Sequence, residues 1–341
     1  MSMKKSVFVL IIMAAIIALG FINIDKLPAV SPEDSVASIL ESLGEPSANK
    51  VMLSGEKVSA ELGRQIVHNG FAEKPGGGKT KKQSKHFVCT SCHNTVREDP
   101  NLAVADPQAR LLYTAEKGIP FLQGSPLFGV VNREEFYNDD YYKKYGEVVI
   151  DARNDIRKSI QLCATECAQG RALKDWEIES ILAYFWSIEL KLEDLNLSAE
   201  EYVKLEMAIN NQETSPELVN MIKSKYLQNS PAHFIPPPEN RKTGAPDIIG
   251  NPENGALIYE NSCLHCHKNR RYSFLHLDQE KITLKYMSKK APKYSRHSIY
   301  QVVRYGLEPK SGKRSYMPKY PAEKMSVQQL EDLRAYLDSA S

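Results

Sequence analysis

Cys89-Thr90-Ser91-Cys92-His93 and Cys263-Leu264-His265-Cys266-His267 are the two stretches that decide how this chain is read. Both follow the pattern Cys-x-x-Cys-His, the attachment signature of c-type haem. In each motif the cysteine sulfurs form thioethers to the porphyrin, and the histidine becomes the proximal iron ligand. A structural zinc site would need two further Cys or His ligands at finger spacing, and neither motif has them. The sequence therefore predicts two covalently bound haem c groups, attached at Cys89, Cys92, Cys263 and Cys266, with His93 and His267 as metal ligands.

Bulk composition sets few other limits on function. The chain has 341 residues, enough for two domains of ordinary size. Its formal net charge is +2, which gives no reason to expect a nucleic-acid partner. The lysine-rich stretch at residues 79–85 is either a solvated loop or a docking patch near the first haem.

The N-terminus has the pattern of an export signal. Lys4 and Lys5 precede an uncharged apolar run from Val7 to Ile22. This run is close to the shortest length that spans a membrane, roughly 17 residues. Residues 1–24 are therefore predicted to be a signal peptide, or a signal anchor that stays in the inner membrane. In both cases we expect a periplasmic location for the remaining domains.

The rest of the chain shows one plan twice, which predicts an all-α fold of two tandem class I cytochrome c domains. Each domain is expected to wrap around one covalent haem, with a helix before its motif and an Ala-Tyr helix at its end. The long stretch from residue 94 to 162 is expected to wrap around the first haem. The predicted divisions are a tether at 25–55, domain 1 at 56–228, a Pro-rich linker at 229–252 and domain 2 at 253–341.

The sixth ligand of the second haem is predicted to be Met317. This residue follows His267 by fifty positions and lies just before the last predicted helix, at residues 326–339. A thioether ligand favours ferrous iron and raises the potential. Weaker candidates in this half are Met287, His276 and His297.

The first half offers no methionine between His93 and its last predicted helix, since the next one is Met207. Cys163 and Cys167 are the remaining candidates for the sixth ligand, whereas His68 and His86 precede the motif and are weaker. A thiolate ligand donates charge to iron and lowers the potential. This difference in ligands between the two haems predicts that a substrate reacts at the first haem and that electrons leave the protein from the second.

The segment around these two cysteines resembles the dihaem thiosulfate dehydrogenases, which are related to the sulfur-oxidation (Sox) cytochromes. The matching residues are Cys163, Gly170, Arg171, Leu173 and Ala183-Tyr184, together with Leu62-Gly63-Arg64-Gln65-Ile66 before the first motif. The resemblance implies that Cys163 is the metal ligand and catalytic residue of an active-site haem. It also implies that two thiosulfates are joined to tetrathionate there, or the reverse.

The chain departs from that family at three positions. Ser159 stands where the family commonly has an arginine, and Cys167 stands where it has a serine. Tyr316 lies beside Met317, where some members carry a lysine. The resemblance therefore supports the fold and the haem ligands more strongly than it supports the substrate.

Three functions follow from these patterns. The first is an oxidoreductase of thiosulfate, tetrathionate or a related sulfur oxyanion, held by Arg153, Arg157, Lys158 and Arg171. The second is a membrane-anchored dihaem electron carrier with no substrate of its own. The third is a dihaem peroxidase, which a tight thiolate ligand disfavours. All three require a redox partner protein, such as a small cytochrome or a respiratory complex, and membrane contact is expected only through the N-terminal segment.

Overall fold

The computed structural model describes residues 30–52, 58–74, 76–290, 298–307 and 316–340. The predicted signal or anchor segment lies outside these residues, and so does His297. Among the described residues, no helix has the length and apolar character needed to cross a membrane.

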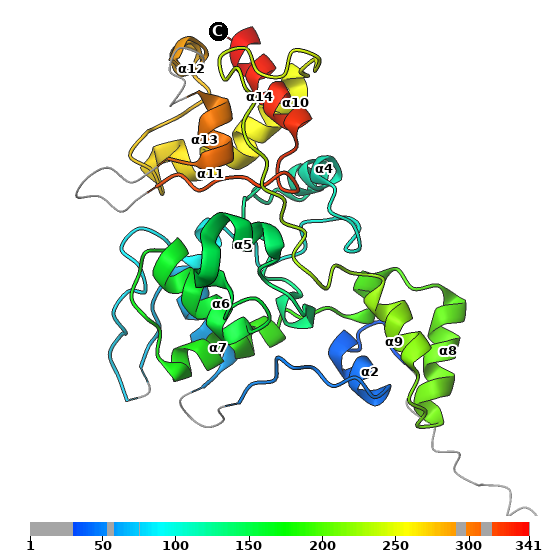
Figure 1. Cartoon of the computed structure of the whole chain (residues 1–341). Coiled ribbons are helices and arrows are strands. Elements are labelled where there is room, and N and C mark those ends of the chain that lie inside the picture. The colour runs from blue at the N-terminus through cyan, green and yellow to red at the C-terminus, as the bar shows by residue number, and fades with distance from the viewer. Residues whose placement is uncertain (1–29, 53–57, 75, 291–297, 308–315, 341) are drawn as a thin grey trace, which may run out of the picture.

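The described part of the chain is built from helices joined by irregular segments, and its only extended pairings are isolated bridges (Figure 1). This confirms the all-α prediction. The helices of the N-terminal and central parts are α2 (Val36–Ser42), α3 (Ala60–Asn69), η1 (Cys89–Ser91), α4 (Pro107–Lys117), η2 (Val130–Asn132), α5 (Asp139–Tyr145), η3 (Gly146–Val149), α6 (Ile156–Leu162), η4 (Cys163–Cys167) and α7 (Asp175–Trp186). The remainder are η5 (Leu192–Leu195), α8 (Ala199–Asn210), α9 (Pro216–Lys223), α10 (Pro252–Ile258), η6 (Tyr259–Cys263), α11 (Leu264–His267), η7 (Lys268–Arg270), α12 (Lys281–Lys290), α13 (Ile299–Tyr305) and α14 (Val327–Ser339).

Local sequence signals account for where the main helices begin and end. α3 begins after Ser59, whose side chain accepts a hydrogen bond from the Leu62 N–H. It ends at Gly70, whose φ of 75° is a left-handed conformation that glycine adopts without strain. α14 begins with a capping box in which Ser326 and Gln329 exchange hydrogen bonds. These signals fix the helices that flank each haem motif.

The same helix crossing occurs in both halves of the chain. α3 crosses α7 at Gly63, where a Cβ atom would overlap the Ser180 carbonyl oxygen. α10 crosses α14 at Gly255, where a Cβ atom would overlap the Asp332 carbonyl oxygen. Glycine at these two positions lets the backbones of the paired helices touch. Each crossing joins the helix before a haem motif to the Ala-Tyr helix at the end of the same half.

Gly255→Ala is expected to destabilise the protein by about 1–3 kcal/mol, the usual cost of overpacking a tight contact. This cost should exceed the roughly 1 kcal/mol that alanine gains over glycine inside a helix. Guanidinium unfolding of the haem-loaded protein measures the change in the free energy of unfolding. Glu253→Ala, on the exposed first turn of the same helix, is the control and should change it by less than about 0.5 kcal/mol. Equal effects from the two substitutions would show that the crossing is not tight.

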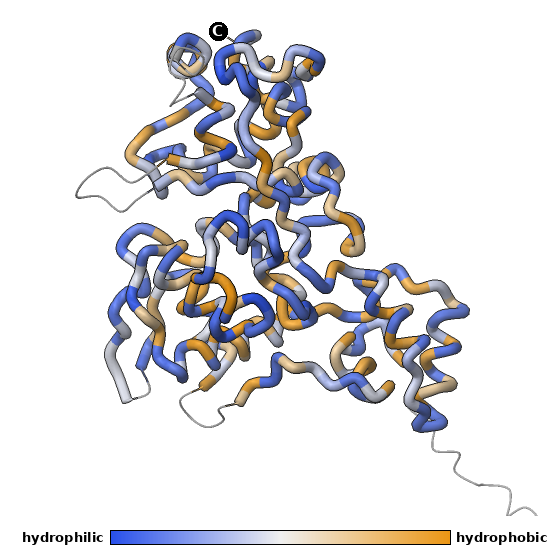
Figure 2. Tube along the Cα trace, in the orientation of Figure 1, coloured by the Kyte–Doolittle hydropathy of each residue, from blue (hydrophilic) through white to orange (hydrophobic). Residues whose placement is uncertain are grey.

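A third hydrophobic cluster lies outside both crossings. It joins α2 to η5, α8 and α9, and its most buried members are Val36, Leu192, Leu205 and Ile222. Figure 2 shows apolar and polar positions alternating along these helices. Residues 36–42 thus form a packed helix inside the segment expected to be a plain tether. α8 and α9 likewise pack on α2 rather than on the α3–α7 pair.

The long stretch after the first motif does not stay in the first half. α4 and Phe121 belong to the hydrophobic cluster of the C-terminal half, where Leu111 and Phe121 are fully buried. The Phe121 N–H donates to the Asn261 carbonyl oxygen at 2.9 Å. Residues 107–121 of this stretch therefore cross over and connect the two halves, while its contact with the first haem stays a prediction.

Candidate functional site

The two motif histidines are oriented in the same way. His93 Nδ1 lies 2.6 Å from the Ser125 carbonyl oxygen, and His267 Nδ1 lies 3.0 Å from the Leu275 carbonyl oxygen. Because a carbonyl only accepts, Nδ1 carries the proton and Nε2 is left for a metal. Burial is the main cause that lowers the pKa of both histidines, which favours the neutral ring that ligation needs. At Gly124 a Cβ atom would lie 2.6 Å from His93 Nδ1, so the loop closes on this ring only with glycine.

The motif cysteines also fit covalent haem. All six cysteines of the chain are free thiols. Burial raises the pKa of Cys89 to about 11 and that of Cys263 to about 12. Cys89 begins the short helix η1, whereas Cys263 ends η6, a π-helix that continues into α11. Each motif thus presents two thiols and one imidazole within five residues, and these are the groups that c-type attachment uses.

The two haem motifs lie next to each other in space, although they come from opposite halves of the chain. Burial raises the pKa of the Cys92 thiol, and the nearby Cys266 thiol is the next largest cause. Burial and Arg271 lower the pKa of His265 to about 4, while a hydrogen bond with the Thr90 main chain acts in the opposite direction. His265 of the second motif therefore contacts Thr90 of the first, and the two motifs lie close together.

Cys163 and Cys167 occupy one turn of π-helix, η4, that directly follows α6. A hydrogen bond between the two thiols raises the pKa of Cys163 and lowers that of Cys167. π-Helical turns are rare and are found mostly at functional sites. The charges of Cys89 and Cys92 also raise the pKa of Cys163, so the turn lies beside the first motif. Cys163 as metal ligand stays a prediction, since both thiols are present in this region.

The loop before the first motif holds this turn in place. Gln83 Nε2 donates to the Ala164 carbonyl oxygen at 2.7 Å, and Ser84 Oγ donates to the Ala168 carbonyl oxygen at 2.6 Å. At Gly170 a Cβ atom would overlap the Gln83 main chain. The glycine that follows Cys163 by seven residues is therefore required for close approach of the loop.

Tyrosines surround the exposed side of the π-helical turn. Burial, followed by nearby groups that include the thiols, raises the pKa of each of them: Tyr137, Tyr141, Tyr145 and Tyr316. Lys319 lies over the Tyr145 ring and lowers the pKa of Cys167. The aromatic richness of residues 136–145 was the sequence signal for this cluster, but it gave no reason to place Tyr316 and Lys319 there.

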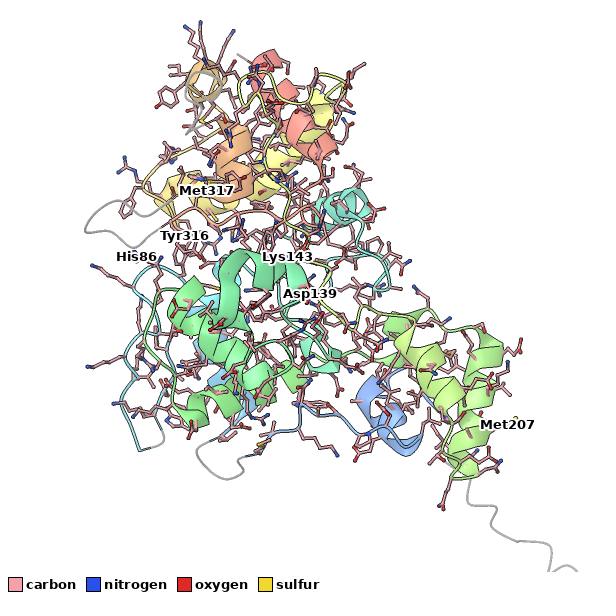
Figure 3. The ribbon with its side chains drawn as sticks, in the orientation of Figure 1. His86, Asp139, Lys143, Met207, Tyr316 and Met317 are labelled. Carbon is pink, nitrogen blue, oxygen red and sulfur yellow. The ribbon has the colours of Figure 1, made fainter. Side chains whose placement is uncertain are left out.

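Tyr316 links the C-terminal half to the π-helical turn. Its hydroxyl donates to the Cys167 carbonyl oxygen at 2.8 Å, and its ring packs edge-on against Phe87 at 5.5 Å between centroids. Figure 3 shows Tyr316 and Met317 at the edge of the C-terminal unit that faces His86. The residue beside the predicted ligand of the second haem thus touches the predicted ligand segment of the first.

The four cations expected to hold a sulfur oxyanion are instead paired with carboxylates. Arg171 contacts Glu177 at 2.8 Å, and the other pairs are Arg153 with Glu135 and Asp139, Arg157 with Glu179, and Lys158 with Asp151. Glu177 and Glu179 are buried, so the two arginines that contact them compensate buried charge. Each of the four cations thus has a carboxylate partner.

Met317 lies on a strap that pairs with the end of α13. The Leu307 N–H donates to the Met317 carbonyl oxygen at 3.1 Å, and Gly306 packs against the same carbonyl. Met317 is half-buried, as a ligand at the rim of a haem site would be. Met207, in contrast, is 61% exposed on α8, far from the first motif (Figure 3).

The weaker ligand candidates have other contacts. His68 Nε2 lies 3.0 Å from the Tyr184 hydroxyl, in the Ala-Tyr helix. Met287 packs against the hydrophobic cluster of the C-terminal half, and His276 pairs with Asp278 at 3.4 Å. These contacts give each side chain a role in folding.

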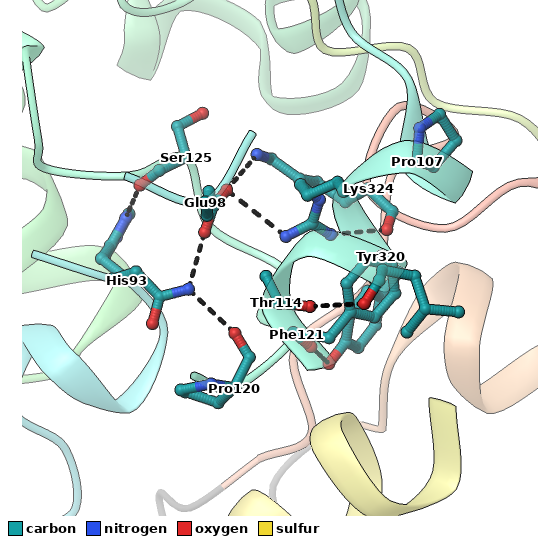
Figure 4. Close-up of polar contacts among 12 residues, drawn as sticks. His93, Glu98, Pro107, Thr114, Pro120, Phe121, Ser125, Tyr320 and Lys324 are labelled. Carbon is teal, nitrogen blue, oxygen red and sulfur yellow. Dashed lines mark hydrogen bonds and ion pairs between the residues drawn. The ribbon is translucent and has the colours of Figure 1, made fainter. Parts of the chain in front are cut away.

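A buried charge cluster lies beside the first motif and joins the two halves (Figure 4). Glu98, which is 0% exposed, contacts Lys324 at 2.8 Å, Arg110 at 3.3 Å and Asn94 at 2.7 Å. Arg110 also lies over the Phe121 ring, 3.9 Å from its centroid. Asn94 follows His93 in the sequence, so the cluster is joined directly to the first haem motif. Sequence reasoning missed it because Glu98 and Lys324 are 226 residues apart.

Comparison with known proteins defines the class of the C-terminal half. Residues 250–337 match the family model described as cytochrome C oxidase, cbb3-type, subunit III. These residues therefore form a c-type cytochrome domain, the class that carries covalently bound haem c and transfers electrons. No curated protein matches the chain, and neither does any solved structure.

Proposed function

We propose that this chain is an exported dihaem protein that transfers electrons between a haem on its first motif and a haem on its second. The observation that carries the proposal is the closeness of the two motifs. His265 hydrogen-bonds the Thr90 main chain, and the Asn261 carbonyl oxygen, just before the second motif, accepts from the Phe121 N–H at 2.9 Å. When bound, haem supplies one-electron redox chemistry at each motif. Two such groups held by adjacent motifs of one chain form a direct route for electrons.

The proposed ligands differ between the two motifs. Cys163 completes the site of His93, and Met317 completes the site of His267. A thiolate lowers the potential and a thioether raises it, so electrons run from the first site to the second. Tyr316 supports this arrangement because it hydrogen-bonds the Cys167 main chain from the position next to Met317.

The finer proposal is that the first site oxidises thiosulfate to tetrathionate, or runs the reverse reaction. The resemblance of the Cys163 segment to thiosulfate dehydrogenases supports it, and so does the closeness of Lys319 to Cys167. The alternative is an electron carrier with no substrate. The pairing of Arg153, Arg157, Lys158 and Arg171 with carboxylates leaves Lys319 as the cation that we propose for binding the sulfur oxyanion.

Titration of the haem-loaded protein with thiosulfate, and of its reduced form with tetrathionate, distinguishes the two. A sulfur oxidoreductase is expected to show haem reduction by thiosulfate or reoxidation by tetrathionate in the visible spectrum. A carrier is expected to ignore both compounds and still exchange electrons with a protein acceptor. Peroxide turnover would instead indicate a peroxidase.

A further inference from the structure

The loop that follows the second motif and the first turns of α12 carry an exposed mixture of apolar and cationic side chains. Phe274 is 56% exposed, Leu275 is 46% exposed and Ile282 is 84% exposed. The same stretch of chain carries five exposed cations, and we refer to this set as the basic loop patch: Lys268, Arg270, Arg271, Phe274, Leu275, Lys281, Ile282 and Lys285. Large apolar side chains that gather on a surface mark interaction sites.

The basic loop patch lies directly against the second motif. The Leu275 carbonyl oxygen accepts from His267, and the Tyr272 N–H donates to the Cys266 carbonyl oxygen at 3.0 Å. Arg271 is close enough to lower the pKa of Cys266, although burial raises it overall. In Figure 1 the same loop continues from α11 towards α12 along one side of the C-terminal unit. A protein docked here would lie beside the second haem motif.

The charge of the patch is not compensated locally. Residues 268–285 hold five cations and two carboxylates, Asp278 and Glu280. The ion pair found here within the described residues joins Asp278 to His276 rather than to a lysine or an arginine. Arg153, Arg157, Lys158 and Arg171 in the first half differ, because each of them contacts a carboxylate. Solvated cations around an apolar centre attract an acidic surface and accelerate its association.

We infer that the basic loop patch is the docking surface for an acidic redox protein that exchanges electrons with the second haem. The apolar side chains form the centre of the contact, and the cations form its polar rim. This inference rests on the proposed electron-transfer function of residues 250–337. We therefore place the docking surface at this patch and not at the lysine-rich stretch of residues 79–85.

The test measures oxidation of the ascorbate-reduced, haem-loaded protein by an acidic and by a basic blue-copper protein. In the patch variant, Arg270, Lys281 and Lys285 are each replaced by glutamate. In the control variant Lys74, Lys82 and Lys85, which are exposed cations of the first half, are each replaced by glutamate. Both variants change the net charge equally, and none of these residues belongs to either haem motif.

At low salt the patch variant is expected to react at least about tenfold more slowly with the acidic acceptor. Its rate should also depend less on ionic strength, and its rate with the basic acceptor should rise. The control variant should retain the wild-type rate with the acidic acceptor within about twofold. Equal losses in both variants, or a larger loss in the control, overturn the inference.

Two further measurements distinguish a failure of this inference from a failure of the proposed function. The visible spectrum of each variant, before and after reduction by ascorbate, shows whether the haems are attached and reducible. Failure of the reduced wild-type protein to pass electrons to either acceptor would overturn the electron-transfer function together with the patch. Electron transfer that is equal in wild type and both variants would overturn the patch alone.

Discussion

Glu98→Ala is expected to destabilise the haem-loaded protein by about 3–5 kcal/mol, because it leaves two buried cations without their carboxylate. Glu98 is fully buried and contacts both Lys324 and Arg110. Lys324 comes from the C-terminal half and Arg110 from α4, so the loss should loosen the contact between the halves. Guanidinium unfolding, followed by far-UV circular dichroism and by haem absorbance, measures the effect.

Glu116→Ala is the matched control for this substitution. Glu116 lies on the same helix as Arg110 and pairs with Lys117, but its side chain is 71% exposed. An exposed pair contributes at most about 1 kcal/mol, so this variant should unfold close to wild type. Comparable destabilisation by both variants would show that the buried cluster does not join the halves.

The same carboxylate predicts how stability depends on pH. Burial alone would raise the pKa of Glu98, but Lys324 and Arg110 outweigh it and hold the pKa below the ordinary value of 4.5. A carboxyl whose pKa is lower in the folded state stabilises the fold above its unfolded pKa. That contribution is lost as the pH falls from about 4.5 through the folded-state pKa. The difference in unfolding free energy between wild type and Glu98→Gln should therefore shrink over this range.

Short-range patterns were sufficient to predict the helices that flank the haem motifs. The last predicted helix, at residues 326–339, is found at Val327–Ser339, with Ser326 as its N-cap. The Ala-Tyr helix expected at the end of the first half is found at Asp175–Trp186. These features depend on residues within a turn or two of each other, so a single sequence contains the information that fixes them.

Contacts between distant segments could not be predicted in this way. No local pattern places α2 against α8 and α9, because these helices lie far apart in the sequence. The prediction that the cations around Cys163 hold a substrate leaves out their carboxylate partners. Arg171 and Glu177 are only six residues apart, so this pair was open to prediction, whereas Arg157 and Glu179 are separated by 22.

Cys163→Ala is expected to change the first haem more than any other single substitution in the ligand segment. Loss of a thiolate ligand removes the charge that it donates to iron, so the potential of this haem should rise. A shift on the order of 100 mV is reasonable, since axial ligands set haem potentials over roughly 800 mV. Electron paramagnetic resonance and a spectroscopic redox titration of the haem-loaded protein measure the change in ligation and in potential.

Cys167→Ala is the control that the chain itself provides. Cys167 shares the π-helical turn and the thiol hydrogen bond with Cys163, so the two substitutions disturb the same local structure. A purely structural effect would therefore be similar in both variants. If Cys163 is the ligand, only its loss should abolish the thiolate signal, and Cys167→Ala should shift the potential much less. Equal changes would remove the ligand assignment, and with it the predicted direction of electron flow from the first haem to the second.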